Sequence, residues 1–483
     1  MTVAVQSPCA EGVVAGAEGR GAAHPTVLLA ATILGSSVAF IDSSVVNVAL
    51  PAIQRDLAAS AADIQWVVNA YLLPLSALVL LGGAAGDHYG RRRVFVAGLA
   101  VFTVASLGCA AAPSLGVLIA ARALQGVGAA MLTPASLAML GAGFAGEARG
   151  RAIGTWAAAG AITSAVGPVV GGWLVDVVGW RAIFLINVPL AAVAVWLAMR
   201  YVADSGARAG TEAAPLDWGG AALVTLGLGM IAWGLTVVPE RGADRLVIAA
   251  LIAGAAMLAA FIGVERRLGA RAMMPLALFG SRTFVGVTFL TLFLYAALGG
   301  LVVLMPYALI RIAHYSATAA GAALLPLPIL VGLVSRPVGR WAQRSGPRVP
   351  LTVGPLVVAG GFALAVRLGP GHFHYWPDVF PPIALIAGGM ALSVAPLTAT
   401  VMAAVDAEHT GSASGVNDAV SSVALLLATA LLGVVLVSSG STDAFMVRFR
   451  EAALASAGLA VLAAASTLAL IAPASTHPRK RAK

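Results

Sequence analysis

Long apolar blocks dominate this sequence, and they constrain the fold more than any other feature. Most of them run for about 18 residues or more, the length that a helix needs to cross a hydrocarbon core of roughly 30 Å. The chain of 483 residues is 60% apolar and only 10% charged, whereas a soluble globular chain carries roughly 25% charged residues. A soluble fold of this composition would lack a polar surface, so we predict an all-α polytopic membrane protein.

Charged turns and turns containing Pro or Gly divide the chain into fourteen predicted spans. The spans lie at 26–50, 65–85, 94–112, 115–140, 152–175, 182–201, 218–238, 246–264, 284–307, 317–338, 350–367, 381–404, 412–437 and 452–473. We therefore expect a 6 + 2 + 6 arrangement. Its parts are a tail at 1–25, a six-helix bundle at 26–201, a linker with two inserted transmembrane helices at 202–283, a second six-helix bundle at 284–473 and a basic tail at 474–483.

A weak internal sequence repeat indicates that the chain consists of two related halves. The loop after the second span reads GAAGDHYGRRR, and the loop after the tenth reads GRWAQRSGPR. Weak repeats at equivalent loops of two six-span halves are typical of transporters. Placing both chain ends and the even-numbered loops in the cytoplasm gathers most of the arginines there, so the positive-inside rule predicts two cytoplasmic termini.

Several function classes are excluded or disfavoured by the residues present. The only lysines are Lys480 and Lys483, so the folded body cannot supply the lysine of a phosphate-binding P-loop. The common hydrolase signatures HExxH and GxSxG are absent. The net charge of +9 lies mostly beside apolar blocks, which indicates contact with the bilayer and not with nucleic acid. We expect no enzyme activity, no metal and no cofactor.

An acid and an arginine lie inside apolar spans, which makes them candidates for function. Asp42 belongs to the first span and Arg122 to the fourth. A charged side chain at the centre of a spanning helix costs roughly 2.5 to 3.5 kcal/mol on insertion scales. We predict that Arg122 pairs with Asp42, although an arginine bonded only to backbone carbonyls is the alternative. Because a nearby cation favours an ionised carboxyl, movement of Arg122 relative to Asp42 would switch proton release.

The first span also carries a polar stripe. On a helical wheel Ser36, Ser43 and Asn47 fall within roughly 40° of one another. Asp42 points about 100° away from Ser43, toward a neighbouring helix. We expect Ser43 and Asn47 to line a watery cavity, although the Asn47 amide would serve equally well in a bond between helices.

Other polar and aromatic residues are candidates for the same substrate cavity. They are Trp66, Tyr71, Gln125, Trp156, Tyr295, Asn417 and Asp418. The aromatic rings would stack on an aromatic substrate, but packing or anchoring at the membrane interface is the plainer interpretation. Asp418, in the sequence SGVND, would line the pathway or simply favour the helix N-terminal dipole.

Two glycine-containing segments have a composition that suits conformational change. In GAAGDHYGRRR, Gly83 and Gly90 permit close packing and a tight turn, and Asp87 can meet an arginine or a helix N-terminus. Together with Arg91 and Arg92 this segment would form a polar latch that holds the two bundles in one state, although a plain basic loop that obeys the positive-inside rule is the alternative.

The other segment is GPVVGG in the fifth span. Here Pro168 would bend the helix, and the glycines beside it would let another helix approach closely. These glycines are Gly167, Gly171 and Gly172.

In order along the chain, these segments resemble motifs of the major facilitator superfamily, in its fourteen-span drug:proton antiporter branch. The likeness rests on GAAGDHYGRRR, IDSSVVNVALP, IQWVVNAYLL, LIAARALQGVGAAM, GAITSAVGPVVGG, WRAIFLINVPL, MMPLALFGSRTF and SGVNDAV. The resemblance implies a monomeric exporter in a bacterial cytoplasmic membrane that exchanges protons for a small amphipathic drug, antibiotic or toxic compound. It also implies that the bend at GPVVGG governs rocking and restricts leak, although a purely structural packing motif is the alternative, since Gly and Pro are common in spanning helices.

The charge of the substrate can be narrowed. Some members of the resembled branch that export dications carry an additional acid in the spans of the second half, whereas the predicted spans from 284 to 404 here contain no Asp or Glu. The resemblance therefore implies monovalent, zwitterionic or neutral substrates in preference to dications. Two alternatives remain open at this stage: a proton-coupled uptake carrier for a metabolite, and a membrane sensor that does not transport.

Overall fold

The structure is a computed structural model that describes residues 24–203, 216–269, 272, 274–369, 373–405, 410–432, 435 and 442–472. Fourteen of its helical segments are long and apolar enough to cross a membrane, as predicted. Most of the two predicted tails, 1–25 and 474–483, lies outside the described residues.

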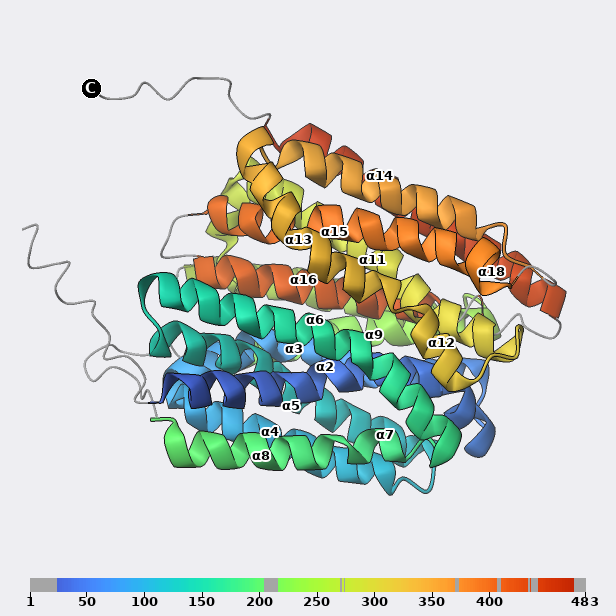
Figure 1. The fold of residues 1–483 in the computed structure, drawn as a ribbon, viewed down its shortest axis with the longest axis horizontal. Helices are drawn as coiled ribbons and strands as arrows, with labels where there is room; N and C mark the ends of the chain where they lie inside the picture. The colour runs from blue at the N-terminus through green and yellow to red at the C-terminus, as the bar shows by residue number, and fades with distance from the viewer. Residues whose placement is uncertain are drawn as a thin grey trace, which may run out of the picture.

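Six spans form the N-terminal half (Figure 1). They are α2 (Pro25–Asp56), α3 (Ala61–Tyr89), α4 (Arg91–Ala110), α5 (Leu115–Gly143), α6 (Gly146–Val177) and a broken span made of α7 (Ala182–Leu185) and α8 (Asn187–Tyr201). α5 packs between α3 and α4, while α2 packs on α6 and α8.

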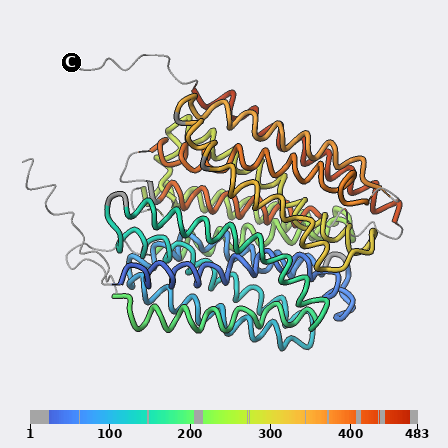
Figure 2. The backbone as a smooth tube through the Cα atoms, viewed as in Figure 1, coloured from blue at the N-terminus to red at the C-terminus, as the bar shows by residue number. Residues whose placement is uncertain are grey.

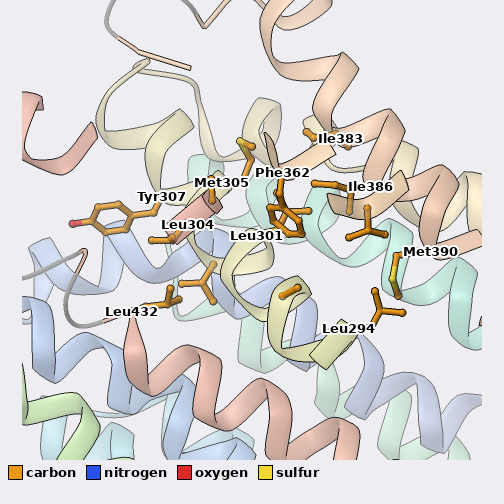
Figure 3. Packing of buried hydrophobic residues seen from close by; sticks show 14 of the residues in the cluster. Leu294, Leu301, Leu304, Met305, Tyr307, Phe362, Ile383, Ile386, Met390 and Leu432 are labelled. Atoms are coloured by element: carbon orange, nitrogen blue, oxygen red, sulfur yellow. The ribbon is translucent and has the colours of Figure 1, made fainter. Parts of the chain in front are cut away.

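The C-terminal half consists of η3 (Leu276–Gly280), α11 (Arg282–Arg311), α12 (Ala317–Ala323), α13 (Pro326–Ser345), α14 (Arg348–Ala365), η4 (Tyr375–Val379), α15 (Phe380–Ala403), α16 (Thr410–Leu431) and α18 (Thr442–Leu470). Its core is apolar. In Figure 3, Leu301 of α11 lies beside Phe362 of α14, with Ile386 of α15 close to both.

The start of α2 and the end of α18 lie at the same end of the bundle, which we call the proximal end (Figure 2). The other end, where α2 finishes at Asp56, is the distal end. Several helices extend beyond the predicted spans. α18 begins at Thr442 and not at 452, so that Arg448 lies inside the helix, paired with Glu451 at 2.7 Å, and not in a loop.

The two inserted helices, α9 (Trp218–Arg241) and α10 (Arg245–Leu268), form a hairpin beside the junction of the halves. α9 packs on α3 of the N-terminal half and on α16 of the C-terminal half. Asn69 of α3 links all three helices, because it donates to Thr236 of α9 (3.4 Å) and accepts from Thr429 of α16 (2.6 Å). The hairpin therefore contacts both halves at once.

Local sequence sets many helix starts. The side chains of Ser60, Asp244 and Ser281 accept hydrogen bonds from backbone N–H groups in the first turns of α3, α10 and α11. Such caps satisfy donors that have no partner within the helix. Gly90 separates α3 from α4 with φ +100°, a conformation that suits glycine.

We predict that Gly126→Val lowers stability by about 1 to 3 kcal/mol, the usual cost of overpacking. A Cβ at Gly126 of α5 would overlap the carbonyl oxygen of Tyr71 and the ring of Pro74 on α3. Thermal unfolding of the purified protein would measure the effect. Gly154→Val on α6 is the control, because a Cβ there meets open space; equal losses from both variants would contradict the expectation.

Candidate functional site

A buried ion pair lies in the N-terminal half. Arg122 of α5 donates through Nη1 to Oδ2 of Asp42 on α2, and these two side chains are 1% and 0% exposed. The structure thus brings together the two residues that the sequence analysis paired. Breaking a buried pair by removing one partner costs about 3 to 5 kcal/mol, because the remaining charge is uncompensated.

Two amides complete the surroundings of the carboxylate. Gln125 and Asn187 each donate through the amide nitrogen to Oδ1 of Asp42 at 3.1 Å. Both amides also donate to Oγ of Ser106 on α4, at 2.8 and 3.3 Å. The ionised carboxylate therefore has three donors from α5 and α8, and no open water is needed to satisfy it.

The guanidinium of Arg122 has partners of its own. Its Nε donates to the backbone carbonyl of Val67 at 2.9 Å, and its Nη1 also donates to Gln125 at 2.8 Å. Its central carbon lies 4.4 Å from the centre of the Tyr71 ring, in reach of a cation–π interaction. A proton that binds Asp42 would compete with the Arg122 guanidinium, which has the Val67 carbonyl, Gln125 and the Tyr71 ring as other contacts.

Two residues predicted to line the cavity belong to this network instead. Tyr71 is 2% exposed beneath Arg122, and Gln125 is fully buried between Arg122 and Asp42. The wheel could not show this, because it places residues on faces of one helix and says nothing of which neighbour covers each face. Asn187 and Ser106 were missed; an amide and a hydroxyl within apolar blocks were the available signals.

The polar stripe of α2 divides into a packed part and an open part. Ser36 donates to Ser136 and accepts from the Trp156 indole N–H at 3.0 Å, and it is 1% exposed. Ser43 is exposed, whereas Asn47 donates to the Ser43 carbonyl at 3.2 Å and its Oδ1 is buried without a hydrogen-bond partner. The open part begins at Ser43, the residue directly after Asp42 on α2.

The remaining cavity candidates lie on several helices. Trp66 is half-buried, and Trp156 makes an edge contact with Phe40, their ring centres 5.8 Å apart. On the C-terminal side, Asp418 is exposed on α16 and interacts electrostatically with Tyr295 of α11.

Asn417, next to Asp418 in the chain, accepts from Thr291 of α11 at 2.7 Å. Asp418 lies more than two turns after the start of α16 at Thr410. Stabilisation by a helix dipole is confined to the first turn, so the dipole does not account for Asp418.

The proximal loop motif bonds within the N-terminal half in this state. Asp87 pairs with Arg91 at 2.9 Å, and Arg91 donates to the Ala138 carbonyl of α5 at 3.0 Å. Arg92 donates to the Val202 carbonyl at 2.9 Å. A Cβ at Gly83 would lie 3.6 Å from Pro134 on α5, an ordinary packing distance. The predicted latch between bundles is therefore not formed by these bonds here.

The GPVVGG motif lies where the two halves cross. A Cβ on Gly172 would overlap the carbonyl of Ala317 on α12, and a Cβ on Gly321 of α12 would overlap that of Pro168. On the other side of α6, Gly167 and Gly171 face Ser44 and Val45 of α2. The glycines allow α6 to touch both halves at backbone distance.

One turn further along α6, an acid closes the distal end. Asp176 accepts from the backbone N–H groups of Ala317 and Thr318 at 3.1 and 2.9 Å, and from the Thr318 hydroxyl at 2.6 Å. Its carboxylate therefore caps α12 of the opposite half. Sequence analysis missed Asp176, since nothing local to the chain says that α12 begins beside it.

A second bond crosses at the same end, from the Tyr307 hydroxyl to Gln54 at 3.1 Å. Asp176 also lines a cavity of about 490 Å³, whose other charged lining residues include Arg55 and Arg311. The two halves are thus joined at the distal end.

Two six-span halves, a membrane-buried ion pair and a glycine crossing between the halves are the features of a membrane carrier. A model of the Major Facilitator Superfamily matches residues 32–429. This chain belongs to that superfamily and is a multi-pass membrane protein.

Several relatives are drug or antibiotic exporters by name. The multidrug resistance protein Stp of Mycobacterium tuberculosis is 34% identical over 84% of this chain and 75% of its own length. The tetracenomycin C resistance and export protein of Streptomyces glaucescens is 33% identical over 96% of this chain and 85% of its own length. The puromycin resistance protein of Streptomyces alboniger is 36% identical over 87% of this chain and 82% of its own length.

Solved structures share the fold. A D-xylose-proton symporter superposes with a TM-score of 0.68 over 93% of this chain and 98% of its own, at 14% identity. A peptide transporter POT superposes with a TM-score of 0.66 over 95% and 97%, at 13% identity. At such low identity these similarities show the fold alone.

We predict that Asp176→Ala loosens the distal closure. In a background without Cys9 and Cys109, Asn47→Cys reports whether a membrane-impermeant thiol reagent, added on the distal side, reaches the buried part of α2. Removing the cap leaves N–H groups of α12 unpaired, so labelling should rise several-fold.

Asp56→Ala is the matched control for this experiment. Asp56 also lies at the distal end, but it binds Trp180 and Arg181 within its own half at 2.9 and 2.7 Å. Labelling that rises equally in both variants, or in neither, would contradict a closing role for Asp176.

Proposed function

We propose that this chain exports a small amphipathic drug, antibiotic or toxic compound in exchange for protons, by alternating access between its two halves. The observation that carries this proposal is the buried Asp42–Arg122 pair, directly beside the exposed Ser43 of the α2 polar stripe. The relatives named above supply the direction of transport and the class of substrate. Export then needs no cofactor and no catalytic step, since the proton gradient supplies the energy.

The arginine distribution supports the orientation that we propose. Arg91, Arg92 and Arg348 lie at the proximal end, which by the positive-inside rule faces the cytoplasm. The distal end, with its Asp176 closure, then faces the exterior of a bacterial cell, and both termini are cytoplasmic. The proposed transporting unit is a monomer, because the two halves of one chain supply both walls of the pathway.

Proton exchange follows from competition at Asp42. The ionised carboxylate binds Arg122, Gln125 and Asn187 and thereby fastens α2 to α5 and α8. A proton removes the charge that holds Arg122, which keeps the Val67 carbonyl, the Gln125 amide oxygen and the Tyr71 ring. Because Ser43 and Asn47 lie on the same helix as Asp42, a shift of α2 changes the proton site and the substrate surface together.

The same positions suggest which charge the substrate carries. Asp42 is occupied by Arg122, whereas Asp418 is exposed and has Tyr295 beside it. A carboxylate facing lipid is costly, so we place Asp418 on the water-filled side between the halves. A single free carboxylate suits a monovalent cation or a zwitterion better than a dication.

We predict that Asp42→Asn abolishes coupling to protons. Transport driven by a pH gradient in proteoliposomes should fall by about 5- to 150-fold, the range that a coupling free energy of about 1 to 3 kcal/mol produces. The uncharged amide cannot take up or release a proton, so exchange of bound substrate without a gradient should persist. Normal pH-driven efflux by Asp42→Asn, with Asp56→Asn as the control, would refute the assignment.

We also predict that Asp418→Asn separates substrates by charge. For a monovalent cationic dye the KM of export should rise about tenfold, as expected for the loss of about 1.4 kcal/mol of binding, while export of a neutral compound stays unchanged. Asp443→Asn, at the start of α18, is the control. Equal effects on both compounds would argue against Asp418 as a contact for the cationic group.

A further inference from the structure

Two carboxyl groups meet at the proximal end of the inserted hairpin. Asp217 caps the start of α9, and Glu265 lies in the last turn of α10. Glu265 is fully buried and interacts directly with the Asp217 side chain. Neither residue takes part in the ion-pair network or in the distal closure.

In each carboxyl group one oxygen accepts a hydrogen bond from a backbone N–H, and the other oxygen has no hydrogen-bond donor. Oδ1 of Asp217 accepts from the N–H of Gly220 at 2.7 Å, and Oε2 of Glu265 accepts from the N–H of Met274 at 2.7 Å. The remaining oxygens, Oδ2 of Asp217 and Oε1 of Glu265, are both buried and have no hydrogen-bond partner.

Two ionised carboxylates in this arrangement would repel each other with no donor between them. Burial of an uncompensated charge is unfavourable, and like charges that share a site do not both ionise. A single proton between the two free oxygens converts the repulsion into a strong hydrogen bond. The two free oxygens are both acceptors, and one bound proton would supply the hydrogen-bond donor that they lack.

A metal ion fits this site less well than a proton. Calcium takes about 6 to 8 oxygen ligands and magnesium about six, whereas the site offers two free carboxylate oxygens. Within the described residues no group of three or more His, Cys, Asp or Glu side chains gathers here or elsewhere.

Among the residues that the structure describes, the charged neighbours do not compensate the pair. Arg266 and Arg267 follow Glu265 on α10, but both side chains are exposed. From α9, Asp217 is the charged group that faces Glu265. Arg271, in the segment beyond α10, lies outside the described residues.

We propose that Asp217 and Glu265 form a proton-binding site that fastens the inserted hairpin to the segment leading into the C-terminal half. The bond from Met274 to Glu265 holds that segment just before η3 and α11. In the orientation proposed above, the site takes its proton from the cytoplasm. Loss of the proton would set the two acids apart and loosen the attachment of the hairpin beside α3 and α16.

Infrared difference spectroscopy of the full chain in lipid nanodiscs tests this site without any transport assay. Ordinary carboxyls, with pKa values near 4, are already ionised at pH about 6. Raising the pH from about 6 to about 9 should remove a protonated-carboxyl carbonyl band from the wild type. That band should be missing throughout in Glu265→Gln and in Asp217→Asn, since an amide donates to the facing oxygen without a titrating proton.

Thermal unfolding gives a second readout. Over the same pH range the wild type should lose about 2 °C or more of melting temperature relative to Glu265→Gln, because only the wild type gains two facing charges. Asp244→Asn is the matched control: Asp244 caps α10 through Val247 at 2.7 Å at the distal end of the hairpin and faces no other acid in the bonds described. It should keep both the band and the pH dependence of the wild type.

Three outcomes would overturn the proposal. The band could survive in both Glu265→Gln and Asp217→Asn, or the wild type could melt in parallel with both variants at every pH. Alternatively, added Na⁺ or Mg²⁺ at fixed pH could remove the band, which would identify a cation site. Because none of these readouts involves substrate, failure here leaves the proposed export function untouched, and failure of export leaves this site untouched.

Discussion

The buried carboxylate of Asp42 is the interaction on which the N-terminal half depends. In a medium without water each polar group needs a partner within the protein. Asp42 finds its partners on α5 and α8, and Arg122 adds the Val67 carbonyl of α3. Several helices therefore converge on one charge, and any event that neutralises it is felt by all of them at once.

The two halves meet through a different kind of contact. At the distal end the glycines of α6 bring backbone against backbone, and Asp176 adds a charged cap to α12. One carboxylate is thus enclosed within a half, while the other lies between halves and beside a cavity. The first is suited to sensing a proton and the second to holding a gate, because only the second must break when the halves separate.

Sequence alone predicted the number of spans and the Asp42–Arg122 pairing, because membrane length and the cost of a buried charge are strong constraints. It did not predict Asp176, Asn187 or the Asn69–Thr429 bond, whose partners come from distant segments. The helical wheel placed Ser36 and Ser43 on one face, yet Trp156 covers Ser36 and leaves Ser43 open. Spacing along one helix fixes a direction, whereas the neighbour found in that direction depends on how the other helices pack.

The position of the inserted hairpin limits how far the halves can swing. α9 packs on α3 of one half and on α16 of the other, so it cannot follow both halves when they rotate apart. The buried Asn69–Thr429 hydrogen bond joins α3 directly to α16, so it must break or be exchanged when these helices separate, at a cost of about 0.5 to 1.5 kcal/mol. A carrier built from the two six-span halves alone would keep the Asn69–Thr429 bond but would lack α9 packed across α3 and α16, so the extra helices add a restraint on the motion as well as adding to the membrane anchor.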